Sequence, residues 1–168
     1  TDSIKYIHLG QVILNSFNMD YILQKSVEIG VSAISPLVSN SNYLKKLDNI
    51  NFRKFNHWKK VIYDSCQQCK RNIIPVLYSP VSISSWIKNI FFYESKKRIS
   101  YLLSVCNDEF ILSNSISFVN VIVSNEVGFF KEEEFFAEKY GFYRINLGSR
   151  IFRVDTASVC FISLLLFF

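Results

Sequence analysis

Apolar residues follow two different spacings along the chain. Short runs rich in Ile, Val, Leu and Phe are typical of strands buried on both faces, and they alternate with segments in which apolar residues recur every three or four positions, as on one side of a helix. The pattern predicts strands over residues 4–12, 32–38, 73–78, 101–105, 118–123 and 142–147. It predicts helices over residues 19–29, 52–71, 84–90 and 131–140, and a terminal helix that begins at Asp155 or Thr156. This alternation predicts one α/β domain over residues 1–168, with a mostly parallel sheet and helices on both of its faces.

Single residues mark the ends and the buried sides of these helices. We predict that Asn18 caps helix 19–29 and that Gly30 ends it in the left-handed conformation. Gly141 ends helix 131–140 in the same way. The buried side of helix 52–71 is predicted to consist of Phe55, Trp58, Ile62, Cys66 and Cys69.

Two of the five glycines, Gly128 and Gly148, each follow a predicted apolar strand. In open α/β sheets, ligands bind just outside the carboxyl ends of the strands, so these two turns are candidates for a ligand site. The plainer alternative is ordinary turn chemistry, in which a glycine after a strand supplies only a permissive backbone.

The charge balance changes this interpretation only a little. The chain has 19 Lys and Arg against 14 Asp and Glu, a net charge of +5, and 49% of its residues are hydrophobic. That apolar fraction is sufficient for a substantial core. The mildly basic balance permits a polyanionic partner such as RNA without requiring one.

The four cysteines do not predict a metal site. Cys66 and Cys69 form a C-x-x-C pair, but no second pair has zinc-ligand spacing, and His8 and His57 do not complete a ligand set. We therefore expect buried thiols in a reducing, cytoplasmic compartment and no metal. No secretory signal pattern precedes the first predicted strand. The apolar run over residues 159–168 is too short to span a bilayer, so we expect no membrane segment and a buried helix there, at a subunit interface.

Four groups of residues, in order along nearly the whole chain, carry a family resemblance. The first comprises Met19-Asp20, Gln24-Lys25 and Glu28-Ile29-Gly30-Val31, and the second comprises Trp58, Gln67-Gln68-Cys69-Lys70-Arg71-Asn72 and Pro75. The third is Ser124-Asn125-Glu126-Val127-Gly128-Phe129, and the fourth and most specific is Leu147-Gly148-Ser149-Arg150-Ile151-Phe152-Arg153-Val154-Asp155-Thr156-Ala157. The fourth resembles the string LGxRILRxETA. Together the segments resemble the SPOUT-class methyltransferases that use S-adenosylmethionine to methylate N3 of a uridine in small-subunit (16S) ribosomal RNA.

The resemblance to this family implies a fold, a cofactor and partners that the spacing of residues alone does not predict. Members of this family have an α/β domain whose C-terminal part passes through a loop and forms a deep trefoil knot, which is a rare feature among folds. They bind S-adenosylmethionine in the knotted loops and form homodimers with the active site near the subunit interface. They also carry an N-terminal β-barrel RNA-binding domain of the PUA type, which this sequence lacks. The expected partners are 16S ribosomal RNA or the small ribosomal subunit and a second copy of the chain.

The resemblance also implies roles for particular residues. Arg150 is expected to stabilise the anionic uridine ring and Glu126 to orient the loop or the cofactor, as the two catalytic candidates. RNA phosphates are expected to meet Arg71, Arg153 and Lys25. The cofactor pocket is expected to be formed by Ile122, Val123, Ser124, Gly128, Leu147, Gly148, Ile151 and Phe152.

Simpler roles compete with these assignments. Lys25 is equally well explained as part of a solvated helix face, paired with Glu28 one turn away. Glu126 has an alternative as an exposed loop acid. Arg150 and Arg153 have one as surface cations that pair with acids.

The sequence departs from the family at three places. Residues 124–128 read Ser-Asn-Glu-Val-Gly where the family has Gly-Pro-Glu-Gly-Gly. Residues 39–42 read Ser-Asn-Ser-Asn in place of Ser-Glu-Arg-Ser, and Asn15-Ser16 replaces Lys-Gly. Two alternatives therefore remain open: a degenerate relative that binds RNA or a partner without catalysis, and a SPOUT methyltransferase with another RNA target, such as a ribose 2′-hydroxyl.

Overall fold

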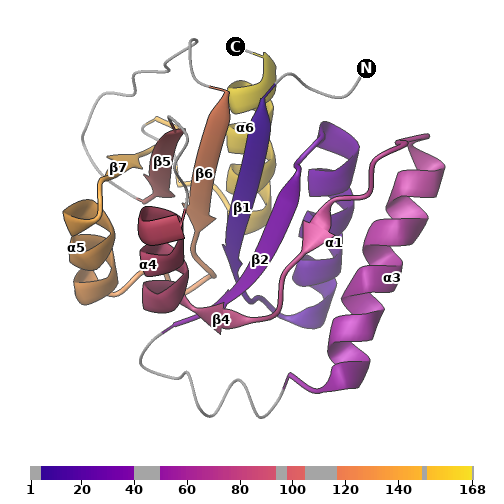
Figure 1. Ribbon diagram of the computed structural model, residues 1–168, viewed down its shortest axis with the longest axis horizontal. Coiled ribbons are helices and arrows are strands. Elements are labelled where there is room, and N and C mark those ends of the chain that lie inside the picture. Colours follow the sequence, from indigo (N-terminus) through magenta and orange to yellow (C-terminus); the bar gives the residue numbers. More distant parts are fainter. Residues whose placement is uncertain (1–4, 40–49, 94–97, 105–116, 149–150, 168) are drawn as a thin grey trace.

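The computed structural model describes residues 5–39, 50–93, 98–104, 117–148 and 151–167, which form one parallel sheet and the helices around it (Figure 1). The strands are β1 (Tyr6–Val12), β2 (Ala33–Val38), β3 (Val76–Leu77), β4 (Val81–Ser82), β5 (Arg98–Leu103), β6 (Phe118–Val123) and β7 (Phe142–Ile145). The helices are α1 (Ser16–Ile29), α3 (Phe52–Gln68), α4 (Ile83–Tyr93), α5 (Lys131–Lys139) and α6 (Val154–Phe167). The strand order is β3-β2-β1-β6-β5-β7, with β4 also paired to β2, and every described pair is parallel.

The helices cover both faces of the sheet, as predicted. Helices α1, α3 and α6 pack over one face, and α4 and α5 pack over the other (Figure 1). The strands alternate between the two cores. In β6, Val121 and Val123 belong to the core under α1, α3 and α6, whereas Ile122 belongs to the core under α4 and α5. A central strand of this sheet therefore needs apolar residues at consecutive positions and not only at every second one.

The order of the strands reverses between β1 and β6. From β1 the chain moves outward to β2 and β3, whereas β6, β5 and β7 extend the sheet on the other side of β1. The loop after β1 leads to α1 on one face, whereas the loop after its neighbour β6 leads to α5 on the other face. Ligands of open α/β sheets bind at such a position.

Some element boundaries differ from the predicted ones. The N-cap of α1 is Asn15, whose side chain accepts a hydrogen bond of 2.9 Å from the backbone N–H of Asn18, so the prediction that Asn18 is the cap was wrong. Gly30 and Gly141 have φ angles of +121° and +86°, which confirms both as helix-ending residues. Helix α3 ends at Gln68, and Cys69 after it is exposed rather than on the buried side, because the helix stops before the stripe reaches it.

Other boundaries shift by a few residues. Of the predicted strand 73–78 only Val76–Leu77 pairs, since Ile73 and Ile74 are exposed. The predicted strand 101–105 is observed as Arg98–Leu103, and residue 105 and Cys106 lie outside the described residues. Helix α6 begins one residue earlier than predicted, at Val154, and in the part of the chain described here no helix has the length and hydropathy needed to cross a membrane.

Gly10 in β1 is required by the close packing of α4 against the sheet. A Cβ atom at this position would lie 2.8 Å from Leu37 Cδ1 and 2.8 Å from Trp86 Cη2. We therefore expect Gly10→Ala to destabilise the fold by about 1–3 kcal/mol through overpacking, measured by urea unfolding. The double variant Gly10→Ala/Trp86→Phe removes the clashing ring atoms, and its loss should be smaller than the sum of the two single losses. Strict additivity would contradict this explanation.

His8 makes the stability of the fold depend on pH. Its imidazole is buried beside Tyr78 and Trp86, its Nε2 lies 2.8 Å from Ser35 Oγ, and burial lowers its pKa to about 4. The unfolded chain thus binds a proton that the folded chain does not between about pH 6.5 and pH 4, so stability is complete above this window and falls as the pH drops through it. The full loss is about 3 kcal/mol.

Urea unfolding at pH 7 and at pH 4.5 tests this expectation. The stability difference between the two pH values should shrink in His8→Gln and persist in His57→Gln, because the His57 side chain is 52% exposed. An unchanged pH dependence in His8→Gln would show that other groups cause it.

Candidate functional site

A pocket of about 320 Å³ lies at the carboxyl ends of β5 and β6, beside the start of α6. Segments that are far apart in the sequence converge on it. Its lining consists of Leu103, Ser104, Val123, Ser124, Gly128, Phe129, Glu134, Asn146, Leu147, Gly148, Ile151, Phe152, Val154 and Ala157. Most of these side chains are apolar, and the polar ones come from strand ends and from α5, as in typical small-molecule sites.

Seven of the eight residues predicted to shape a cofactor pocket line this one: Val123, Ser124, Gly128, Leu147, Gly148, Ile151 and Phe152. The structure does not place the eighth, Ile122, in the lining. Its side chain is fully buried under α4 and α5, because neighbours in a strand point to opposite faces.

Two glycine turns bring the backbone to the surface of the pocket. Gly128 and Gly148 have φ angles of +86° and +107°, and a Cβ atom on either would have no protein atom within 4 Å. The first turn is closed by a bond of 3.0 Å from Gly128 N–H to the Asn125 carbonyl. In the second, Gly148 N–H donates to the Asn146 side-chain oxygen at 2.8 Å. Both positions thus leave room for a ligand to approach the main chain.

Gln11 of β1 forms hydrogen bonds that connect segments next to the pocket. Its buried amide nitrogen donates to the carbonyl of Ser124 at 3.1 Å, and its amide oxygen accepts from the Ser158 hydroxyl at 3.2 Å. The residue thereby links β1, the end of β6 and α6. Gln11 is not among the residues predicted from the sequence, although a lone Gln within a largely apolar strand was the available signal.

Glu126 lies outside the pocket. Its carboxylate is exposed and accepts hydrogen bonds from the side-chain amides of Asn18 at 3.2 Å and Asn15 at 3.5 Å. The structure thus places this residue between the loop after β6 and the first turn of α1.

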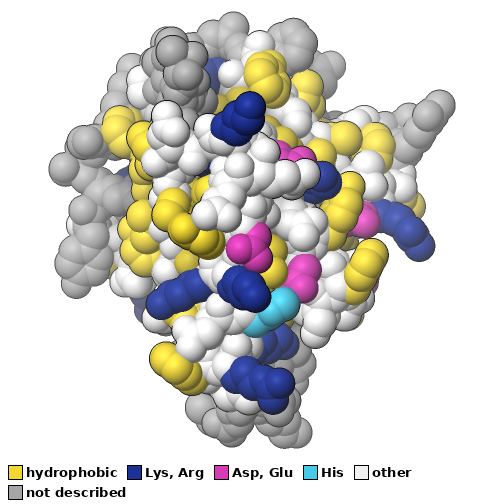
Figure 2. Space-filling view, turned by 90° about the vertical axis from the view of Figure 1, so that its right-hand side faces the viewer, with side chains coloured by type: hydrophobic (Ala, Val, Ile, Leu, Met, Phe, Trp, Pro, Cys, Tyr) yellow, Lys and Arg dark blue, Asp and Glu magenta, His cyan; other side chains and the backbone are white. Residues whose placement is uncertain are grey.

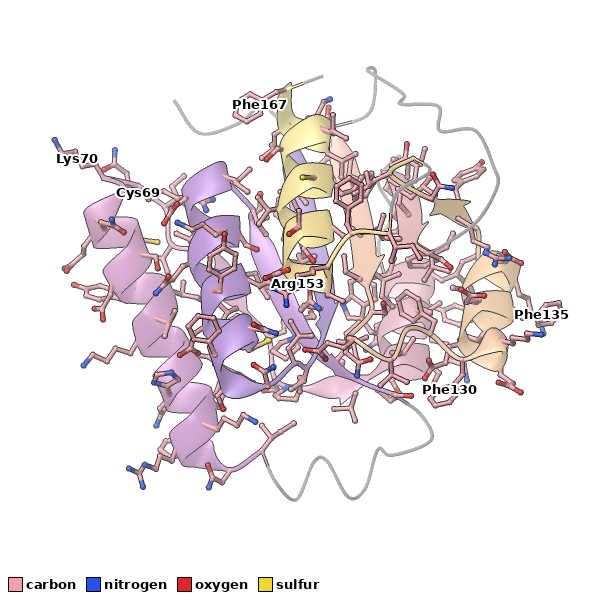
Figure 3. All side chains as sticks on the ribbon, turned by 180° about the vertical axis from the view of Figure 1, so that it is seen from behind. Cys69, Lys70, Phe130, Phe135, Arg153 and Phe167 are labelled. Atoms are coloured by element: carbon pink, nitrogen blue, oxygen red, sulfur yellow. The ribbon has the colours of Figure 1, made fainter. Side chains whose placement is uncertain are left out.

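The predicted RNA-binding cations do not gather at one place. Arg153 is exposed at the start of α6 (Figure 3), and Arg150 lies outside the described residues. Lys25 pairs with Glu28 at 2.9 Å, and that hydrogen bond raises the pKa of the Lys25 ammonium, which confirms the predicted pairing of the two side chains. Arg71 donates from Nη1 to the Val27 carbonyl at 3.2 Å.

Arg71 also lies at the other edge of the sheet. Helix α3 leads back from the carboxyl ends of the strands to the start of β3, and Figure 3 shows Lys70, the residue before Arg71, far from Arg153. The fold therefore separates these two cations.

Glu134 lines the pocket, but the sequence did not predict a role for it. Of the three acids at the start of α5, Glu134 lines the pocket, while Glu133 is buried and accepts from the Ser39 hydroxyl and from Phe130 N–H. Glu134 accepts from the Ser104 hydroxyl and, at 3.1 Å, from Arg144 Nη2. Within the described ranges, no group of three or more His, Cys, Asp and Glu side chains is arranged to hold a metal ion.

The sequence is similar to proteins that are named for the methylation of ribosomal RNA. The chain is 39% identical over 165 residues to Ribosomal RNA small subunit methyltransferase E of Buchnera aphidicola subsp. Acyrthosiphon pisum, covering 98% of this chain and 64% of that relative. It is 32% identical over 159 residues to the protein of the same name in Mesomycoplasma hyopneumoniae, covering 90% of this chain and 65% of the relative. The chain thus spans a little under two thirds of the length of these relatives.

The fold is also similar to that of a solved methyltransferase structure. The Ribosomal RNA small subunit methyltransferase E of Neisseria gonorrhoeae, bound to S-adenosyl methionine, superposes with a TM-score of 0.81 at 28% identity, over 98% of this chain and 66% of that one. The model of the family described as RNA methyltransferase domain matches residues 2–166. The chain therefore belongs to the RNA methyltransferase domain family.

Proposed function

We propose that this chain is the cofactor-binding, catalytic domain of an enzyme that transfers a methyl group from S-adenosylmethionine to N3 of a uridine in small-subunit ribosomal RNA. The observation that carries the proposal is the pocket itself, in which the Leu147–Gly148 turn and the Gly128 turn meet. The first turn belongs to the motif that most resembles the methyltransferase family, and the second lies where the family has Gly-Pro-Glu-Gly-Gly. The relatives named for ribosomal RNA methylation support the choice of substrate.

The residues present fit the cofactor. The pocket volume of about 320 Å³ lies within the range of small-molecule sites, and its apolar walls suit a flat purine. A side chain at Gly128 or Gly148 would project into open space instead of against protein, so both turns leave room for the cofactor to approach the main chain. The carboxylate of Glu134 offers an acceptor to hydroxyl or ammonium groups.

The chemistry divides between the cofactor and the chain. When bound, S-adenosylmethionine supplies a methyl group that is already activated by its sulfonium. The protein must orient the uridine and stabilise the negative charge that develops as N3 loses its proton. We assign the stabilising role to the guanidinium of Arg150, because it belongs to the motif between Gly148 and the start of α6.

We further propose that the C-terminal part of the chain forms a trefoil knot. The support is that the segments after β5, β6 and β7 and the first turn of α6 all line one pocket. We also propose a homodimer, supported by the apolar helix α6, whose Phe167 is 75% exposed.

The RNA contact is proposed to involve Arg153 and the outer side of α3. This helix carries four cations, Arg53, Lys54, Lys59 and Lys60, against one acid, Asp64. Figure 2 looks onto this side of the molecule and shows Lys and Arg side chains spread across it. Such a surface suits phosphate contacts, which contribute affinity without reading sequence. Lys25 and Arg71 are weaker candidates, because each already has a protein partner.

Two measurements test the proposed function. Isothermal titration of the chain with S-adenosylmethionine should show binding at one site per chain. Incubation with small ribosomal subunits and labelled cofactor, followed by mass mapping of the RNA, should place a methyl group on a uridine base. Absence of cofactor binding would favour the degenerate relative that the altered residues 124–128 suggest, and a methyl group on a ribose would favour the other RNA target.

A further inference from the structure

Glu134 is the charged side chain in the described lining of the pocket. The other lining side chains are apolar, or are the neutral polar side chains of Ser104, Ser124 and Asn146. An acid in a largely apolar pocket is unfavourable unless its oxygens have partners. Solvation by water alone therefore does not explain why an acidic side chain lies in this pocket.

The carboxylate is held in a fixed position. One oxygen accepts from the hydroxyl of Ser104 at the end of β5, and the other accepts from Arg144 Nη2 of β7 at 3.1 Å. Its side chain is only 18% exposed. Ser104 is itself fixed, since its N–H donates to the Ile145 carbonyl at 2.9 Å. The acid is thus oriented from two neighbouring strands.

This arrangement leaves Glu134, a residue of the pocket lining, with unused hydrogen-bonding capacity and negative charge. A carboxylate has about four acceptor sites, and Ser104 and Arg144 use one on each oxygen. Arg144 is also shared, because its Nη1 donates to Glu138 Oε1 at 3.1 Å. Two carboxylates therefore surround one guanidinium, and the cluster keeps an excess negative charge.

We propose that Glu134 is the acceptor in this pocket for a hydrogen-bond donor of the bound cofactor, and that Ser104 and Arg144 position it for that contact. The inference rests on the proposed function. S-adenosylmethionine carries hydrogen-bond donors on two parts, the nucleoside with its adenine amino group and ribose hydroxyls and the amino-acid part with its α-ammonium, and its net charge is positive. An oriented acid with spare lone pairs suits either donor better than a neutral amide does.

Glu138 provides a matched control. It has the same side chain, lies one turn further along α5 and binds the same guanidinium, but it does not line the pocket. If Glu134 acts only by tying α5 to β7, then Glu134→Gln and Glu138→Gln should behave alike. If Glu134 contacts the cofactor, only the first variant should lose affinity.

The experiment is isothermal titration of the wild-type chain and of E134Q and E138Q with S-adenosylmethionine, S-adenosylhomocysteine and 5′-methylthioadenosine. We expect E134Q to weaken the binding of S-adenosylmethionine by about tenfold or more, and E138Q by less than about threefold. Thermal unfolding of all three proteins reports whether each is folded. Ser104→Ala, which keeps the carboxylate but removes a bond that orients it, should show a smaller loss of affinity.

The three ligands identify the donor. If E134Q also weakens 5′-methylthioadenosine, which lacks the amino-acid part, Glu134 contacts the nucleoside; if it weakens only the other two, Glu134 contacts the α-ammonium. Either result supports the proposal. Affinity of folded E134Q for all three ligands within about twofold of the wild type would overturn it. Failure of the wild-type chain to bind any of them would instead reject the proposed function.

Discussion

Gly148→Ala is expected to weaken S-adenosylmethionine binding by about tenfold, and Gly148→Val by roughly a hundredfold or more. At this position φ is +107°, and a Cβ atom would meet no protein atom within 4 Å. An added methyl group would therefore occupy the pocket that Gly148 lines, and the larger Val side chain would fill more of it. Isothermal titration measures the loss directly.

Backbone strain at a positive φ angle must be separated from occlusion of the pocket. Gly141 supplies the control, because it has a φ of +86° and equally open space around its Cβ position, but it lies between α5 and β7 and does not line the pocket. Gly141→Ala should share the strain, about 1–2 kcal/mol of folding stability, and keep the affinity. Equal losses of affinity in Gly141→Ala and Gly148→Ala would show that the pocket has been misplaced.

The fold was largely predictable because its central strands are buried on both faces. A run such as residues 118–123 has no polar interruption apart from Asn120, and that side chain donates to the Ser100 hydroxyl within the sheet. Segments at the periphery gave weaker signals. Ile73 and Ile74 are apolar yet exposed, so hydrophobicity alone extended the predicted strand beyond the two residues that pair.

The pocket was predictable only where its residues lie in a recognisable local motif. The segments 123–128 and 147–152 contain such motifs, and their residues Val123, Ser124, Gly128, Leu147, Gly148, Ile151 and Phe152 line one pocket. Glu134 was not distinguishable from Glu132 and Glu133, because its role depends on β5 and β7, which lie at other places in the sequence. Gln11 was missed for the same reason, since its partners are 113 and 147 residues away.

The altered loop at residues 124–128 bears on whether the chain is an active enzyme. Two glycines and a proline of the family motif are replaced, yet Gly128 keeps a positive φ angle and the turn is closed by hydrogen bonds from Gly128 and Val127 to Asn125. Asn125 has taken over a turn-forming role that proline and glycine usually fill. The backbone shape that a ligand needs is therefore compatible with this sequence.

Arg150→Ala is expected to reduce the rate of methyl transfer by roughly a hundredfold to a thousandfold at saturating S-adenosylmethionine. The reason is the negative charge that a uridine ring acquires as N3 is deprotonated, which a guanidinium stabilises more strongly in the transition state than in the bound substrate. Single-turnover methylation of small ribosomal subunits measures the chemical step, and titration with the cofactor alone should give an unchanged affinity. Arg150→Lys keeps the charge but loses the planar fork, so its rate should fall between the two.

Arg153→Ala is the natural comparison, because this neighbouring arginine is proposed to meet RNA phosphate instead. Loss of the Arg153 side chain should raise the RNA concentration needed for half-maximal rate and leave the rate at saturating RNA unchanged. The number of counterions released on RNA binding, measured from the salt dependence of the affinity, should fall by about one. The two variants thus separate stabilisation of charge during the reaction from attraction of the RNA before it. A normal rate in Arg150→Ala, with both substrates saturating, would remove Arg150 from the chemical step and leave the protein without an identified group to stabilise the uridine anion.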